Sequence, residues 1–191
     1  MFNEIGRKAI HITIIFVLGG YYLIEKAYGK PLALLCLAGL LILFFILEYL
    51  RLDLGLRLPF FEPFIRPKEQ FKVYGVIYFL CGVIIALAVF DFKIALTAIL
   101  MTTFGDMAAA LIGQRFGKTL LYRNKTCQGC IAELIVNLAV GFIVLFGLNI
   151  YLPIAMAFTA TIVETLADEL DDNILVPLFS GFVGQILFLT I

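Results

Sequence analysis

The sequence predicts an all-α, polytopic integral membrane protein, and its composition and apolar stretches support this prediction. Hydrophobic residues make up 63% of the 191-residue chain, charged residues make up 15%, and the mean hydropathy is +1.07. A spanning helix needs about 20 mostly apolar residues. Seven such stretches can be drawn, at about 9–24, 31–50, 73–90, 94–113, 130–148, 150–167 and 174–191. We therefore expect a single transmembrane domain over residues 1–191 with about seven transmembrane helices.

The form of these stretches favours helices over a barrel. Leu, Ile, Val, Ala and Phe follow one another continuously, whereas a barrel strand alternates apolar and polar residues. The first stretch is interpreted as a retained span rather than a signal peptide. Glu4 lies in the segment before it, and no small-x-small cleavage site follows.

Basic residues predict the orientation in the membrane. Eleven of the fourteen Lys and Arg residues lie before the first stretch, between the second and third, or between the fourth and fifth. Only Lys26, Lys30 and Lys93 lie in the opposite loops. The positive-inside rule then places the N-terminus in the cytoplasm. The cytoplasmic face would comprise loops 51–72, 114–129 and 167–173, in a cell membrane or an ER-type membrane.

Acidic residues gather at the same predicted face. Asp106, Glu133 and Glu164 lie within three different stretches, each near its cytoplasmic end. A charge inside the bilayer is costly and usually marks a site or a pathway. The outer half is poor in polar residues, Gln185 being the deep exception, so we expect a site rather than a transport route. A structural hydrogen bond would account for Gln185 equally well.

Two polar loops flank these acids. The segment 115–125 carries four cations, Arg115, Lys118, Arg123 and Lys125, which would also suit contact with anionic headgroups. The segment 166–173 carries Asp168, Glu169, Asp171 and Asp172 without a basic residue. Cations that neutralise phosphates, together with carboxylates that bind Mg²⁺, are what phosphoryl transfer requires. The two loops therefore favour phosphoryl chemistry.

Other motifs are less informative. Gly113 to Thr119 reads GxxxGKT, one residue short of a P-loop and without a preceding strand. Gly105, Ala109, Gly113 and Gly117 form a small-residue stripe, which indicates close helix packing. The single histidine, His11, fits an interfacial structural role as well as a functional one. The lone CxxC at 127–130 makes no zinc site. With no net charge, nothing indicates nucleic-acid binding.

One segment resembles the CTP-dependent lipid kinases, the group of dolichol kinase, phytol kinase and CTP-type diacylglycerol kinase. Their nucleotide motif runs DxxAxxxGxxxG, a short spacer, then KKTxEG. Asp106, Ala109, Gly113 and Gly117 match the first part, and the sequence NKTCQG at 124–129 matches the second through Lys125, Thr126 and Gly129. Asn124 replaces the first lysine of that motif and Gln128 replaces its acid. These two departures leave open whether CTP or ATP is the phosphoryl donor.

The resemblance extends to three other segments. Glu4, Arg7, Lys8 and His11 match an E-x-x-R-K-x-x-H opening. The stretch 66–82 is similar to the family's loop and third span. In the late segment an acid precedes Asp-Asn and Pro; the matching residues are Glu164, Asp172, Asn173 and Pro177.

The resemblance implies a kinase that moves the γ-phosphoryl group of CTP to the hydroxyl of a membrane lipid alcohol, with Mg²⁺ as cofactor. It implies Mg²⁺ ligands at Asp106, Asp171 and Asp172, with Glu164 as a further ligand or base. The expected nucleotide-binding residues are Arg7, Lys8, Gly113, Arg115, Gly117, Lys118, Lys125, Thr126 and Gly129. His11 would complete the catalytic group of Asp106, Lys125 and Glu164.

Two other functions remain open at this point. A cytidylyltransferase would use the same nucleotide groups to make a CDP-lipid and release pyrophosphate. A transporter would need polar residues through the outer half and internal repeats, neither of which is found. The lipid alcohol itself (polyprenol or dolichol, phytol-like, or diacyl- or dialkylglycerol) and the oligomeric state are not predicted.

Overall fold

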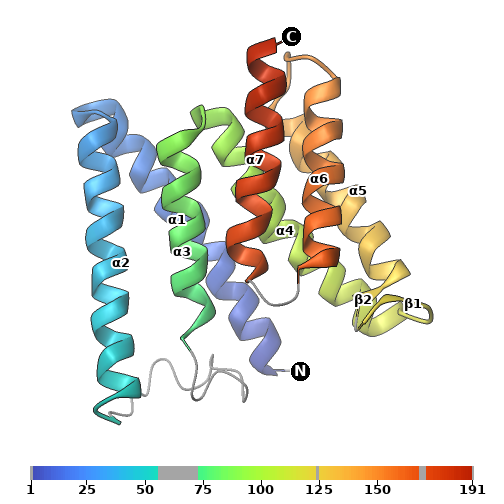
Figure 1. The fold of residues 1–191 in the computed structure, drawn as a ribbon, viewed down its shortest axis with the longest axis horizontal. Helices are drawn as coiled ribbons and strands as arrows, with labels where there is room; N and C mark the ends of the chain where they lie inside the picture. The colour runs from blue at the N-terminus through green and yellow to red at the C-terminus, as the bar shows by residue number, and fades with distance from the viewer. Residues whose placement is uncertain (1, 56–72, 124, 168–170, 191) are drawn as a thin grey trace. The chain divides into compact units, whose positions relative to one another are not determined.

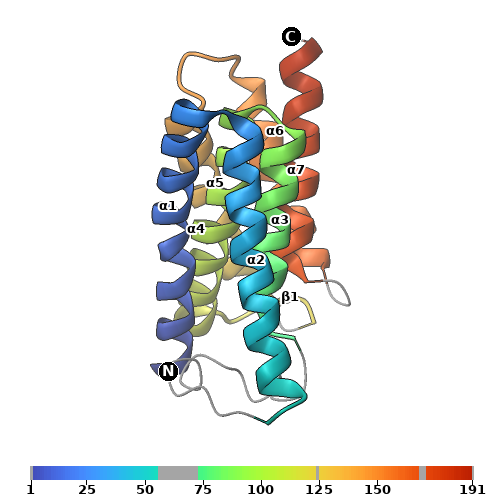
Figure 2. The same ribbon diagram turned by 90° about the vertical axis from the view of Figure 1, so that its left-hand side faces the viewer.

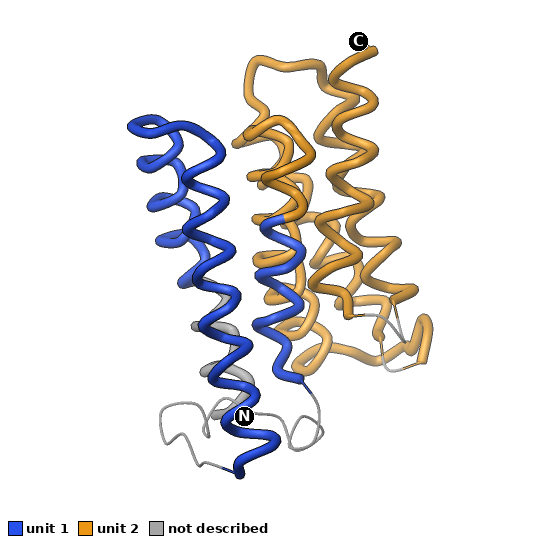
Figure 3. Tube along the Cα trace, turned by 60° about the vertical axis from the view of Figure 1, so that its left-hand side comes forward, with its two compact units in different colours: residues 1–84 blue, residues 85–191 orange. Residues whose placement is uncertain are grey.

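The computed structural model describes residues 2–55, 73–123, 125–167 and 171–190, and for residues 2–12 it describes the backbone alone. These residues form seven helices and one two-stranded sheet (Figure 1). The helices are α1 (Phe2–Tyr28), α2 (Lys30–Leu52), α3 (Gly75–Val89), α4 (Phe92–Phe116), α5 (Cys127–Val144), α6 (Tyr151–Leu166) and α7 (Asp172–Thr190). The strands are β1 (Leu120–Tyr122) and β2 (Lys125–Thr126). The chain divides into two compact units, residues 1–84 and 85–191 (Figure 3).

Each of the seven apolar stretches is helical, so the all-α prediction is confirmed. Among the described residues, α2, α4, α5 and α7 are long and apolar enough to cross a membrane. The apolar helices α3 and α6 are shorter, with 15 and 16 residues. That all seven helices cross, with the N-terminus in the cytoplasm, stays a prediction.

In the first unit, α1 and α2 form a helical hairpin. Gly29 ends α1 with φ of 91°, a conformation that glycine adopts without strain, and Pro31 follows in the first turn of α2. Apolar side chains then join α2 to the start of α3; they are Leu40, Leu41, Phe44, Tyr74, Val76 and Leu80.

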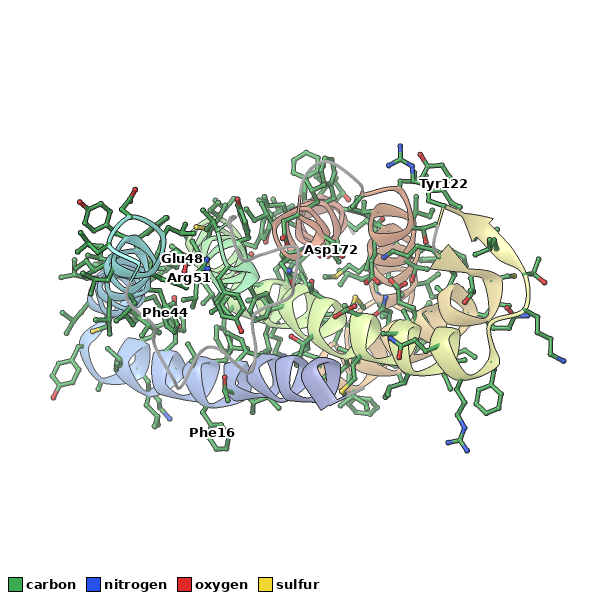
Figure 4. The ribbon with its side chains drawn as sticks, turned by 90° about the horizontal axis from the view of Figure 1, so that it is seen from below. Phe16, Phe44, Glu48, Arg51, Tyr122 and Asp172 are labelled. Atoms are coloured by element: carbon green, nitrogen blue, oxygen red, sulfur yellow. The ribbon has the colours of Figure 1, made fainter. Side chains whose placement is uncertain are left out.

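A buried carboxylate fixes the lower end of α2. Glu48 is only 8% exposed, and its Oε2 accepts a hydrogen bond of 2.9 Å from Nε of Arg51 (Figure 4). Its Oε1 accepts one of 2.8 Å from the backbone N–H of Tyr74. The charge of Glu48 is thus paired, as burial requires, and the bond to Tyr74 ties α2 to the residue before α3.

In the second unit, α4 packs against α5, α6 and α7. More of its apolar segment is buried than in α5 or α7. Figures 1 and 2 show that α4 and α6 end where α5 and α7 begin, at the lower end of this unit. The chain therefore brings the ends of four helices, with the sheet between α4 and α5, to one end of the unit.

Several polar side chains in this unit make hydrogen bonds within one helix or across two elements. Thr97, Thr102 and Thr103 are buried on α4, and each hydroxyl donates to the carbonyl four residues earlier. Gln185 of α7 donates to Oδ2 of Asp91 and accepts from its backbone N–H, at 2.6 and 2.8 Å. Gln185 thus makes a structural hydrogen bond at the upper end of the unit, one of the two interpretations that the sequence allowed.

Glycine allows three helices to meet in the upper half of the second unit. A Cβ atom at Gly141 of α5 would lie 2.8 Å from Cβ of Pro153 in α6 and 2.9 Å from Cε of Met101 in α4. Neither distance is compatible with an added methyl group. The packing of α4, α5 and α6 therefore depends on the absence of a side chain at this position.

We predict that Gly141→Leu destabilises the fold by about 1–3 kcal/mol, the usual cost of overpacking. The matched control is Gly39→Leu in α2, where a Cβ atom would meet nothing within 4 Å. The measurement is the free energy of unfolding in detergent micelles. Equal stability of the two variants would contradict the packing described here.

Candidate active site

A pocket of about 250 Å³ lies at the lower end of the second unit, where α4 ends and α5 begins. Its lining comes from α4, β2, α5 and α6. The residues that matter for its chemistry are Asp106, Gly113, Lys125, Thr126, Gly129 and Glu164. The pocket therefore combines two carboxylates, one amine, one hydroxyl and two glycines.

Close packing of α4 on α5 shapes this pocket. A Cβ atom at Gly129 would lie 2.9 Å from the carbonyl oxygen of Ala109 and 3.4 Å from Cα of Gly113. A Cβ atom at Gly113 would lie 3.0 Å from Oγ1 of Thr126. The small-residue stripe is thus a packing surface, and Gly113 and Gly129 also line the pocket.

Thr126 begins α5 as its N-cap. Its Oγ1 accepts a hydrogen bond of 3.2 Å from the backbone N–H of Gly129. This bond fixes the hydroxyl beside the first turn of α5, where the helix dipole favours negative charge. Gly117, at the end of α4, lies against the other side of Thr126.

An ion pair crosses the pocket. Nζ of Lys125 lies 3.1 Å from Oε1 of Glu164, whose side chain is only 2% exposed. Burial alone would lower the pKa of Lys125, but the carboxylates of Glu164 and Asp172 outweigh it and raise the pKa. Asp106 and Asp172 are both close enough to Glu164 to act on it electrostatically. The amine is therefore charged and surrounded by acids.

A buried polar group lies one turn further along α5. Glu133 and Asn137 are 0% and 1% exposed. Nδ2 of Asn137 donates to Oγ1 of Thr161 at 3.1 Å and to Oε1 of Glu133 at 3.5 Å. Oε2 of Glu133 and Oδ1 of Asn137 accept no hydrogen bond from the described residues. Two buried acceptor atoms, deeper in the unit than the pocket, thus remain without a hydrogen bond from the described residues.

The loop between α4 and α5 is a short hairpin. Strand β1 pairs antiparallel with β2, and Arg123 adopts a φ of 47° in the turn. Oε1 of Gln128 accepts from the backbone N–H groups of Lys118 and Thr119, at 3.2 and 3.4 Å. Gln128 therefore secures the loop that follows α4, and an acidic side chain would accept the same bonds. Asn124 lies outside the described residues.

The structure brings together six of the predicted site residues and separates others from the pocket. Asp106, Gly113, Lys125, Thr126, Gly129 and Glu164 line it. Arg115 and Lys118 are exposed and do not line it; Arg115 lies 5.6 Å from the centre of the Phe116 ring. The side chains of Arg7, Lys8 and His11, and all of residues 168–170, lie outside the described part.

The two aspartates that begin α7 differ in their surroundings. Oδ1 of Asp171 accepts from the backbone N–H of Asn173 at 3.0 Å and from its Nδ2. Asp172, seen at the start of α7 in Figure 4, acts electrostatically on Lys125 and Glu164. Asp172 is therefore linked electrostatically to the pocket.

The donor set fits a metal ion only in part. Among the described residues, no three acidic, histidine or cysteine side chains come close enough to hold an ion by themselves. Mg²⁺, however, is usually held by one or two carboxylates together with substrate phosphates and water. Asp106, beside a lysine that would bind those phosphates, meets this lower requirement.

Comparison with known proteins gives three relatives. The chain is 30% identical to CTP-dependent diacylglycerol kinase 1 of Saccharomyces cerevisiae over 145 residues, which cover 71% of this chain and 48% of the yeast protein. The protein of the same name from Eremothecium gossypii is 26% identical over 145 residues, covering 71% and 44%. An uncharacterised protein of Methanocaldococcus jannaschii is 25% identical over 187 residues, covering 95% and 92%. No family model and no solved structure matches the chain.

Through these homologues the chain is related to the CTP-dependent lipid kinase family. It spans about half the length of the two fungal kinases that it matches. Its apolar helices and its similarity to these kinases indicate an integral membrane protein.

Reasoning from the sequence missed several residues that lie in or near this pocket. Asn137 and Thr161 were not singled out, although they bind each other beneath the pocket. Cys130 was set aside with the CxxC motif, yet it lines the pocket. The available signal was helical spacing, because Cys130, Glu133 and Asn137 recur on one face of α5.

We predict that Lys125→Met destabilises the fold by about 1–3 kcal/mol, because it leaves the buried carboxylate of Glu164 without its cation. The matched control is Lys118→Met, which removes an exposed amine from the same loop. Adding Glu164→Gln to Lys125→Met should restore part of the loss, as a double-mutant cycle of unfolding free energies would show.

The pH dependence follows from the raised pKa of Lys125. A group whose folded pKa is raised contributes stability that is fully present below its unfolded pKa and lost as the pH rises through the folded value. Above neutral pH, the stability difference between wild type and Lys125→Met should therefore persist and should decrease only in strongly alkaline solution. A decrease in mildly alkaline solution would contradict the charged amine.

Proposed function

We propose that this chain is a CTP-dependent kinase that phosphorylates the hydroxyl of a membrane lipid alcohol at the cytoplasmic leaflet. The observation that carries the proposal is the convergence of Asp106, Lys125, Thr126 and Glu164 on one pocket at the end of the second unit. Two relatives are CTP-dependent diacylglycerol kinases, and they suggest the donor and the reaction class.

The phosphates of CTP would lie against the first turn of α5. Lys125 supplies a positive charge, the hydroxyl of Thr126 can donate to a phosphate oxygen, and Gly113 and Gly129 let the phosphates approach the backbone. A pocket of about 250 Å³ is small for a whole ligand compared with the usual range of roughly 300–1,000 Å³. It therefore suits the phosphate groups, with the nucleoside lying outside it.

A bound Mg²⁺ would supply positive charge that stabilises the phosphate groups. Asp106 would be its principal protein ligand, and Glu164 and Asp172, which interact electrostatically with one another, are further candidates. Asp171 is predicted as a ligand from the sequence. Its Oδ1 accepts a hydrogen bond from the backbone N–H of Asn173, and this bond would stabilise the start of α7. The ion pair with Glu164 keeps the amine of Lys125 directed into the pocket before the nucleotide arrives.

In the proposed reaction the oxygen of the lipid hydroxyl forms a bond to the γ-phosphorus. The bond from that phosphorus to the bridging oxygen breaks, and CDP leaves. The hydroxyl proton passes to a carboxylate or to water, and Glu164 is the candidate acceptor within the pocket. Because the transition state of phosphoryl transfer is loose, positioning and charge matter more than the strength of this base.

The first experiment supplies the purified protein in lipid nanodiscs with Mg²⁺ and CTP labelled at either the γ- or the α-phosphate. Diacylglycerol, a polyprenol and a phytol-like alcohol serve as acceptors, and a lipid phosphate is supplied in a separate reaction. We expect γ label in the lipid fraction. Transfer of α label to a lipid phosphate would instead establish a cytidylyltransferase, and transfer of neither label from folded protein would overturn the proposal.

We predict that Asp106→Asn lowers kcat for γ-phosphoryl transfer by about 100-fold or more, since a neutral amide is a poor ligand for Mg²⁺. The matched control is Asp91→Asn, the same change at the other end of α4, which should leave the rate near that of wild type. Comparable rates for Asp106→Asn and wild type would remove Asp106 from the metal site.

A further inference from the structure

A second cavity, a groove of about 520 Å³, lies between the first half of α5 and the last half of α6. Its lining is mostly aliphatic and aromatic. The residues that form its walls are Ile131, Leu134, Phe158, Ile162 and Leu166, with Leu121 of the hairpin at one end. Figure 1 shows α5 and α6 side by side with the hairpin at their lower end. Water would be poorly held in a cavity of this composition.

The groove adjoins the pocket that holds Lys125 and Glu164. Cys130 lines both cavities. Its Sγ lies 3.4 Å from Oγ1 of Thr165, which belongs to the groove, and Glu164, the residue before Thr165, lines the pocket. A molecule lying in the groove with a polar end at Cys130 and Thr165 would therefore reach the pocket.

We infer that this groove binds the hydrocarbon chain of the lipid alcohol next to its hydroxyl, so that the hydroxyl enters the pocket at Cys130 and Thr165. The inference rests on the proposed kinase function and deepens it. A kinase acting on a lipid needs an apolar surface that is continuous with its phosphate site, and among the described cavities this groove has that position.

The length of the groove limits how much of a lipid it can bind. On α5 it extends from Cys127 to Leu134, about 10 Å of helix at 1.5 Å per residue. Only the part of one chain nearest the hydroxyl fits within that length, and the rest of the lipid stays in the bilayer. The groove therefore binds the first part of one hydrocarbon chain, and it does not measure the whole chain.

Adjacent turns of α5 offer a matched pair of variants. Ile131 lines the groove and is 53% exposed, whereas Ile135, one turn further on, is 61% exposed and does not line it. Ile131→Trp should fill the groove and exclude the hydrocarbon chain. The loss of this apolar contact should raise KM for diacylglycerol about 10-fold, and KM for CTP should not change. Ile135→Trp should behave as wild type. Equal effects of the two variants would overturn the inference.

A second measurement tests the groove without turnover. Wild-type protein in phosphatidylcholine nanodiscs is photolabelled with a diacylglycerol that carries a diazirine on the acyl chain near the glycerol. We expect labelled residues within 127–134 and 158–166, and we expect unlabelled diacylglycerol to compete where added phosphatidylcholine does not. Label spread over all lipid-facing helices, or equal competition by phosphatidylcholine, would overturn the inference that the groove binds the lipid alcohol.

The two proposals can fail separately. Competed labelling of the groove in a protein that transfers no γ-phosphate would overturn the kinase reaction and support lipid-alcohol binding. Transfer of γ-phosphate by a protein whose groove takes no competed label would support the kinase reaction and overturn the groove.

Discussion

The close contact between α4 and α5 is the constraint on which the candidate site depends. The two helices approach so closely at Gly113 and Gly129 that a methyl group on Gly129 would press against the carbonyl of Ala109. This approach places Thr126 and Lys125 opposite Asp106, although 19 positions separate Lys125 from Asp106 in the sequence. A small-residue stripe that serves membrane helix packing thereby also builds a polar pocket.

The polar groups at this end would be costly in an apolar surrounding, and the structure offsets that cost in two ways. Glu164 is paired with Lys125, and Asn137 binds Thr161. Oε2 of Glu133, by contrast, has no partner among the described residues. Buried groups that stay unsatisfied call for an explanation, and here they lie directly beneath the pocket in which the proposed chemistry occurs. The apolar groove on the other side of Cys130 gives a lipid access to that pocket.

Much of this arrangement could be predicted from the sequence. Continuous apolar runs predict the helices, which the structure confirms. The spacing of Asp106, Gly113, Lys125, Thr126 and Gly129 predicts a shared nucleotide site; these residues line one pocket, and their role stays a prediction. Spacing could not reveal that Arg115 and Lys118 are exposed and do not line it, because both lie near the end of α4, where the chain leaves the helix.

Contacts between helices also could not be predicted from the sequence. The pairing of Asn137 with Thr161 joins residues 24 positions apart, and the bonds of Gln128 to the hairpin depend on the course of the loop. The groove likewise arises from the relative placement of α5 and α6. Such features follow from side-chain geometry across elements, which no local pattern encodes.

Direct binding of CTP tests the central claim, that the contact of α4 and α5 forms the phosphate site. Calorimetric titration of the purified protein with CTP and Mg²⁺ would compare wild type with Gly129→Ala, which places a methyl group between Ala109 and Thr126. The account predicts that wild type binds CTP and that the variant, still folded, binds at least about 10-fold more weakly, a loss of about 1.4 kcal/mol. Equal affinity of the two proteins for CTP would contradict it.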